Sequence, residues 1–168
     1  GGARIVVIHP DGTQRILTVD FHSACDPDVS FDAQKILFAG KRTADDRWNV
    51  YEMDVDGADA RQVTRDRGNC RSPCYQSTLY TIISPQPWYQ LTFVSDAAGE
   101  MNEIGSGAAT HLYSTKLDGT SVRRLTYNLS DDFDPVLMSD GRILFASWQR
   151  SVLRREELGR VGLFGVNL

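Results

Sequence analysis

Residues 26–64 carry the stretch that decides the fold, DPDVSFDAQKILFAGKRTADDRWNVYEMDVDGADARQVT. It alternates β-favouring runs with turn signals, of which Asp56-Gly57 is the clearest. The β-favouring runs cover residues 29–31, 35–39, 49–55 and 60–64. Short runs of β-branched, aromatic and aliphatic residues separated by turn residues predict four antiparallel strands joined as a meander.

The pattern of this stretch recurs along the chain. An Asp-Gly turn followed by a short run that ends in Thr occurs at Gly12, Gly57 and Gly119, with spacings of 45 and 62 positions. An Asp-Pro pair followed by an apolar strand occurs twice. The repeat positions of the second to fourth units are Asp26, Pro27, Asp56, Gly57, Asp118, Gly119, Asp134, Pro135, Asp140 and Gly141. A four-stranded meander repeated around an axis forms the blades of a β-propeller, so the repeat predicts an all-β fold.

The repeat predicts that residues 1–168 are a partial β-propeller of about three four-stranded antiparallel blades. We expect the last hairpin of one blade at 4–18, a complete blade at 26–64, a blade with an insertion at 70–126 and an incomplete blade at 132–168. The pattern is broken in residues 65–89 and 151–160. We expect a fragment cut at both ends, whose apolar end faces are covered by the remaining blades and other domains of a longer chain.

Two segments carry a family resemblance. Residues 51–57 (YEMDVDG) and 139–145 (SDGRILF) resemble the TolB-like, or WD40-like, propeller repeat. A narrower resemblance is to the propeller region of hydrazine synthase alpha subunit-like proteins. It is carried by residues 38–42, 48–53, 68–71 and 134–148. This resemblance implies a bacterial protein whose parent chain holds c-type haem outside these residues, and we expect a periplasmic or secreted location.

Composition and motifs bear on the function. The chain has 18 basic and 22 acidic residues, a net charge of −4, with both signs scattered. Nucleic-acid binding would need a basic patch, and a membrane span would need roughly 18 consecutive apolar residues; neither is present in the sequence. Because G-x-S-x-G, H-E-x-x-H and C-x-x-C-H are also missing, we expect no catalytic, cofactor-binding or metal-ligating residue in this chain.

The three cysteines leave three alternatives open. Cys70 and Cys74 are spaced C-x3-C, and Cys25 is the third. They are free buried thiols, or Cys70 and Cys74 form a disulfide in an oxidising compartment, or a metal is bound with help from His22 or His111.

The two Asp-Pro pairs favour a structural role over a catalytic or metal-binding one. Proline lacks an N–H and suits the first position of a strand, so Pro27 and Pro135 are expected to open their blades. The aspartate before each can accept hydrogen bonds from backbone N–H groups at the junction between blades.

The sequence therefore predicts a non-catalytic scaffold or protein-interaction module. Its partner-binding loops are expected at residues 41–48, 95–109 and 151–160, since loops carry function on a rigid scaffold. The alternative is the propeller portion of a haem-bearing oxidoreductase with its chemistry outside this chain. A hydrolase propeller would require a downstream G-x-S-x-G.

Overall fold

A computed structural model describes residues 2–82, 84–149 and 159–167, and every regular element in these ranges is a β-strand. The strands are β1 (Val6–Ile8), β2 (Gln14–Ile16), β3 (Ser23–Val29), β4 (Lys35–Lys41), β5 (Asn49–Asp54), β6 (Arg61–Gln62), β7 (Cys70–Tyr75), β8 (Leu79–Thr81), β9 (Ser84–Trp88), β10 (Gln90–Ser95), β11 (His111–Lys116), β12 (Arg123–Arg124), β13 (Asp132–Leu137), β14 (Ile143–Gln149) and β15 (Arg160–Val166). In the described ranges no helix is long and apolar enough to cross a membrane.

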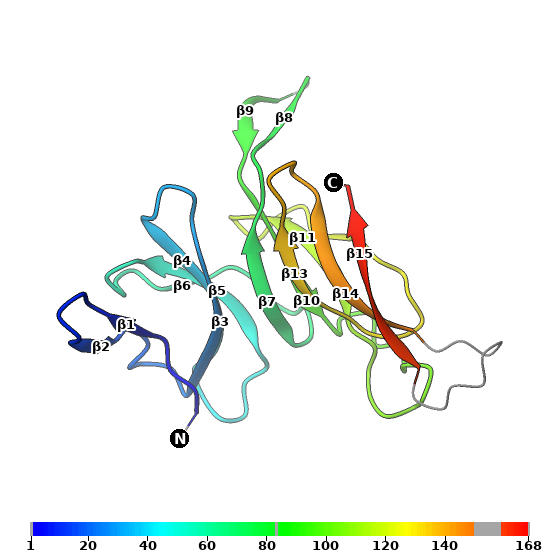
Figure 1. Ribbon diagram of the computed structural model, residues 1–168, viewed down its shortest axis with the longest axis horizontal. Helices are drawn as coiled ribbons and strands as arrows, with labels where there is room; N and C mark the ends of the chain where they lie inside the picture. The colour runs from blue at the N-terminus through cyan, green and yellow to red at the C-terminus, as the bar shows by residue number, and fades with distance from the viewer. Residues whose placement is uncertain (1, 83, 150–158, 168) are drawn as a thin grey trace.

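The strands form consecutive antiparallel sheets (Figure 1). The first blade has the order β3-β4-β5-β6, the second has β7-β10-β11-β12, and the third has β13-β14-β15. The β1-β2 hairpin precedes them, and β8-β9 is a separate hairpin between β7 and β10. The all-β propeller architecture with four-stranded antiparallel blades is therefore confirmed.

The first strand of each blade carries the same β-bulge. In β3, β7 and β13 the pairing shifts so that two residues stand opposite one residue of the neighbouring strand. The bulges are Asp26-Pro27 opposite Phe38, Ser72-Pro73 opposite Phe93, and Asp134-Pro135 opposite Phe145. The first residue of each has a positive φ, of 55°, 45° and 51° in that order.

These bulges correct one expectation from the sequence. Pro27 and Pro135 are expected at the first position of their strands, whereas β3 begins at Ser23 and β13 at Asp132. The bulge explains how an internal strand position tolerates proline, because the extra residue leaves the regular hydrogen-bond ladder.

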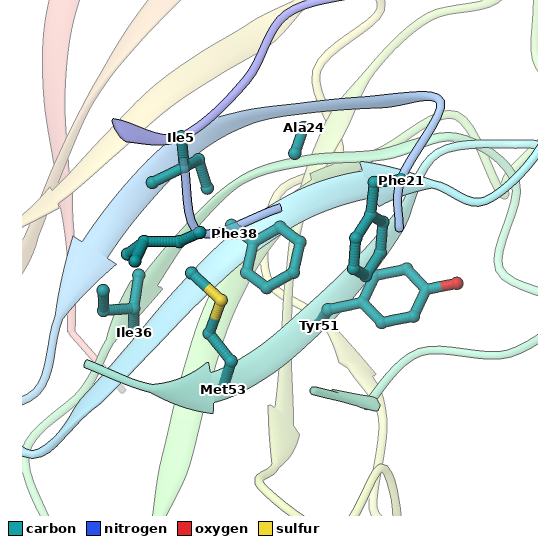
Figure 2. Close-up of a cluster of buried hydrophobic side chains, with 8 residues drawn as sticks. Ile5, Phe21, Ala24, Ile36, Phe38, Tyr51 and Met53 are labelled. Atoms are coloured by element: carbon teal, nitrogen blue, oxygen red, sulfur yellow. The ribbon is translucent and has the colours of Figure 1, made fainter. Parts of the chain in front are cut away.

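Three hydrophobic clusters lie between successive sheets. The first joins the β1-β2 hairpin to the first blade, where the rings of Phe21, Phe38 and Tyr51 pack together (Figure 2). The second joins the first and second blades, and the third joins the second and third blades. Neighbouring residues of one strand serve different clusters: Phe38 belongs to the first and Leu37 to the second. Both faces of the first and second blades are thus buried, because successive side chains along a strand point to opposite faces.

The connections leave the blades at two opposite ends. The β8-β9 hairpin projects at the same end as the β3-β4 and β13-β14 turns, whereas the connections at 42–48 and 96–110 lie at the other end (Figure 1). The partner-binding loop expected at 151–160 falls mostly on residues 150–158, which lie outside the described residues.

Candidate functional site

The first strands of the three blades line an open groove of about 540 Å³. Each of these strands is the edge strand of its sheet, and β7 contacts both β3 and β13, so the three lie around the axis of the propeller. The groove is lined by residues 26–29, Phe31, residues 72–75 and residues 134–137. The two predicted Asp-Pro pairs therefore meet in one place, although they are separated by the whole second blade.

Asp26 links the first blade to the second. Its Oδ2 accepts hydrogen bonds from Arg71 Nε at 2.8 Å and from the backbone N–H of Ser72 at 3.0 Å. Partial burial opposes ionisation of Asp26, but the bonds from Arg71 and Ser72 outweigh it and lower the pKa of this carboxyl. The Asp26 carboxylate thus forms hydrogen bonds between the first and second blades, and a structural role fits it better than that of a general base.

Two further carboxylates line the groove. Asp28 Oδ2 accepts a hydrogen bond from the backbone N–H of Tyr75 at 2.7 Å, and burial raises the pKa of Asp28. Asp134 is exposed, and its Oδ1 accepts a bond from Ser72 Oγ at 3.3 Å. The groove thus presents hydrogen-bond acceptors and negative charge rather than a nucleophile with a base.

The bulge in β7 separates Cys70 from Cys74. Four positions apart in a regular strand, they would share a face, but the extra residue places Cys70 in the second hydrophobic cluster and Cys74 in the third. All three cysteines are free thiols. Burial raises the pKa of Cys70 to about 11 and, with help from the charge of Asp28, that of Cys74 to about 12. These thiols are therefore poor nucleophiles at neutral pH.

The third alternative for the cysteines is a metal site completed by His22 or His111. Among the described residues, no group of three or more His, Cys, Asp or Glu side chains is placed to hold a metal ion. His22 is exposed, while His111 is buried at the start of β11.

The predicted Asp-Gly pairs lie in the turns at β5-β6, β11-β12 and β13-β14, away from the groove. The glycines of these turns have φ of 88°, 82° and 87°, a conformation that glycine adopts without strain. In each turn the aspartate accepts a hydrogen bond from the backbone N–H two residues on. These acceptors are Asp56 for Ala58, Asp118 for Thr120 and Asp140 for Arg142. The turns thus shape the blades.

One polar cluster around a buried histidine was not anticipated from the sequence. His111 is fully buried, with Nε2 3.5 Å from Glu100 Oε2 and Nδ1 4.0 Å from Asp132 Oδ2. Glu100 also pairs with Arg124 at 3.0 Å. Burial lowers the pKa of His111. The carboxylates lie on opposite sides of the ring, but neither ring nitrogen makes a hydrogen bond within the described residues, so it is the pair of Glu100 with Arg124 that links the 96–110 connection to β12. A lone histidine in the sequence gave no signal of it.

The repeated bulges, the four-stranded meanders and the packing between blades define the class by its fold: this is a β-propeller region. No family model matches the chain. The chain is 30% identical to hydrazine synthase subunit alpha of Kuenenia stuttgartiensis, in an alignment of 202 residues. The match covers 95% of this chain and 25% of that protein. The resemblance to the alpha subunit of hydrazine synthase is thereby confirmed.

Solved structures give the same result. Hydrazine synthase of Kuenenia stuttgartiensis matches with a TM-score of 0.79 and 27% identity, over 98% of this chain and 26% of that one. A putative TolB from Agrobacterium tumefaciens matches at 0.69 and 20%, over 99% and 58%, and TolB from Acinetobacter baumannii at 0.57 and 20%, over 92% and 35%. The chain thus spans about a quarter of the hydrazine synthase chains it matches.

Proposed function

We propose that the chain is a non-catalytic β-propeller module, a scaffold and protein-interaction surface within a larger protein. The observation that carries this proposal is an uncovered apolar face on the third blade. Val161 and Leu163 of β15 are 58% and 72% exposed, and Val136 of β13 is 53% exposed. Leu144 of β14 stands opposite both Val136 of β13 and Gly165 of β15, so these three residues lie on one face of the sheet. Val161 and Leu163 are four and two positions before Gly165 and therefore lie on the same face.

The internal repeat indicates what such a face is for. Equivalent aromatic pairs stand on neighbouring strands of each blade: Phe38–Tyr51, Phe93–Tyr113 and Phe145–Phe164. The residue before the second aromatic is Val50 in the first blade and Leu112 in the second, and both are fully buried against the following blade. Leu163 holds the same position in the third blade. A further blade of the same kind is the occupant this repeat favours.

Chain length supports the same proposal. The hydrazine synthase chains that match are about four times as long as this chain. Their additional length leaves room for the remaining blades and other domains, which are the partners we propose for the two end faces. A periplasmic or secreted location is part of this proposal and rests on the family resemblance alone.

Residues 1–168 expressed alone should bind a hydrophobic dye or self-associate, because the apolar face of the third blade would be in water. Leu163→Asp should reduce the dye signal several-fold. Val19→Asp, which also replaces an exposed side chain (67%) but lies outside the blades, should not. A monomeric, dye-silent chain with a sharp thermal transition would contradict the proposal.

A second function is favoured by the 30% identity over nearly the whole chain. In this alternative the chain is the propeller portion of a haem-bearing oxidoreductase that resembles the hydrazine synthase alpha subunit. The c-type haem would be attached elsewhere in the parent protein, since C-x-x-C-H is missing from these 168 residues.

The visible absorption spectrum of the full-length protein from its native host separates the two functions. A Soret band that persists after acid and acetone extraction would indicate covalently bound haem and support the oxidoreductase. A colourless protein would contradict it and leave the non-catalytic scaffold.

A further inference from the structure

We propose that a pocket at one end of the first blade binds a small oxyanion with two or more negative charges, such as a phosphate ester or a polycarboxylate. The pocket has a volume of about 340 Å³ and is lined by Arg47, Asn49, Gln62, Arg65, Asp66 and Gly68. It shares no lining residue with the groove around the axis, and the inference does not depend on the scaffold role.

Two unpaired arginines line this pocket. Arg47 lies in the 42–48 connection and Arg65 in the 63–69 connection, so two separate segments contribute a guanidinium group each. Neither takes part in any of the ion pairs among the described residues. By contrast, four other arginines pair with a carboxylate: Arg61, Arg71, Arg124 and Arg142. Acidic residues outnumber basic ones by 22 to 18, so a shortage of carboxylates does not explain the two unpaired groups.

The carboxylates near the pocket leave its positive charge largely uncompensated. Asp46 Oδ2 accepts hydrogen bonds from the backbone N–H groups of Arg42 and Thr43, at 3.0 and 2.8 Å, and is used within its own connection. Asp66 is the one acidic residue in the lining, and it belongs to none of the ion pairs of the described residues. The lining therefore holds two positive charges against one negative charge, which favours a negatively charged ligand.

Hydrogen bonds fix the walls of the pocket. Asn49 Nδ2 donates to the carbonyl of Arg47 at 3.2 Å, and Thr64 Oγ1 donates to Asn49 Oδ1 at 3.3 Å. Gln62 Nε2 donates to the carbonyl of Thr64 at 2.8 Å. The two amide side chains thus hold the backbone at or beside each arginine. A pocket that is ordered before binding spares the ligand part of the entropic cost of ordering it.

The arginine side chain determines the class of ligand. A guanidinium group is a planar fork of N–H donors that matches two oxygens of a phosphate or a carboxylate. An inorganic cation would be repelled, and a neutral apolar molecule would leave both charges without a partner. Ligand pockets usually measure roughly 300–1,000 Å³, so a pocket of this volume takes a small molecule.

The test is isothermal titration calorimetry of the full-length protein with inorganic phosphate, citrate and acetate at constant ionic strength. Phosphate or citrate should bind at least about tenfold more tightly than acetate, which has a single charge, and the tighter of the two identifies phosphate or carboxylate chemistry. Arg47→Gln/Arg65→Gln should weaken that binding at least about tenfold. Asp66→Asn should tighten it about threefold, because it removes a competing negative charge.

Arg123→Gln is the matched control. It removes the same charge from an exposed arginine of β12 that forms no ion pair with the described residues, and it should change the affinity by less than about twofold. Circular dichroism melting curves check that each variant is folded. No measurable binding of phosphate or citrate, or equal affinity in the double variant and the wild type, would overturn the inference. Either result would leave the proposed propeller module standing, because dye binding reports on the third blade.

Discussion

Phe93→Ala should lower the free energy of unfolding by about 3–5 kcal/mol, the usual loss for removing a buried phenylalanine. Phe93 is fully buried and stands opposite the Ser72-Pro73 bulge. It stacks on Tyr113, with ring centroids 5.8 Å apart, and belongs to the cluster that joins the first and second blades. The substitution therefore weakens both the second blade and its junction with the first.

Urea denaturation followed by tryptophan fluorescence measures this loss in the full-length protein. Phe31→Ala is the matched control, because it removes the same ring from a position that is 73% exposed. The control should change the free energy by no more than about 0.5 kcal/mol. Similar losses for the two variants would mean that the packing between the blades contributes little.

The blades could be predicted from the sequence because their signals are local. Asp-Gly turns, alternating apolar strands and short runs ending in threonine lie within some forty residues of one another, and their recurrence indicates a meander. The third bulge could not be predicted because Ser72-Pro73 replaces Asp-Pro and lies inside residues 65–89, where the sequence pattern is broken. Any residue that accepts a positive φ before proline can occupy this position, so the backbone requirement is broader than the Asp-Pro motif.

The groove could be predicted only in part. The Asp-Pro pairs were recognised as structural positions, but the meeting of Asp28 and Asp134 depends on how three blades pack, which no local pattern specifies. Likewise, the C-x3-C spacing suggests a pair of cysteines on one face. A one-residue bulge reverses the facing of every later side chain in β7 and sends Cys74 to the other cluster. The partner-binding loops at 41–48, 95–109 and 151–160 remain a prediction.

Asp26→Ala should lower the free energy of unfolding by about 2–4 kcal/mol, from the loss of charge-assisted hydrogen bonds and from strain. The variant leaves Arg71 and the backbone N–H of Ser72 without their acceptor. It also places alanine at a φ of 55°, a conformation that asparagine and aspartate tolerate better. Asp26→Asn keeps the backbone conformation and one acceptor oxygen, so its loss should be smaller, about 1–2 kcal/mol.

The pH dependence of these losses separates charge from strain. The folded protein lowers the pKa of Asp26 below its usual 3.8, so the charge stabilises the fold above that value and is lost as the pH falls through the folded pKa. The difference between wild type and Asp26→Asn should therefore be full at about pH 7 and should shrink at acid pH, as the pH falls below 3.8 through the folded pKa. The difference between Asp26→Asn and Asp26→Ala should persist at both, because backbone strain does not titrate. A gap between wild type and Asp26→Asn that is independent of pH would show that the ionised carboxylate does not hold the two blades together.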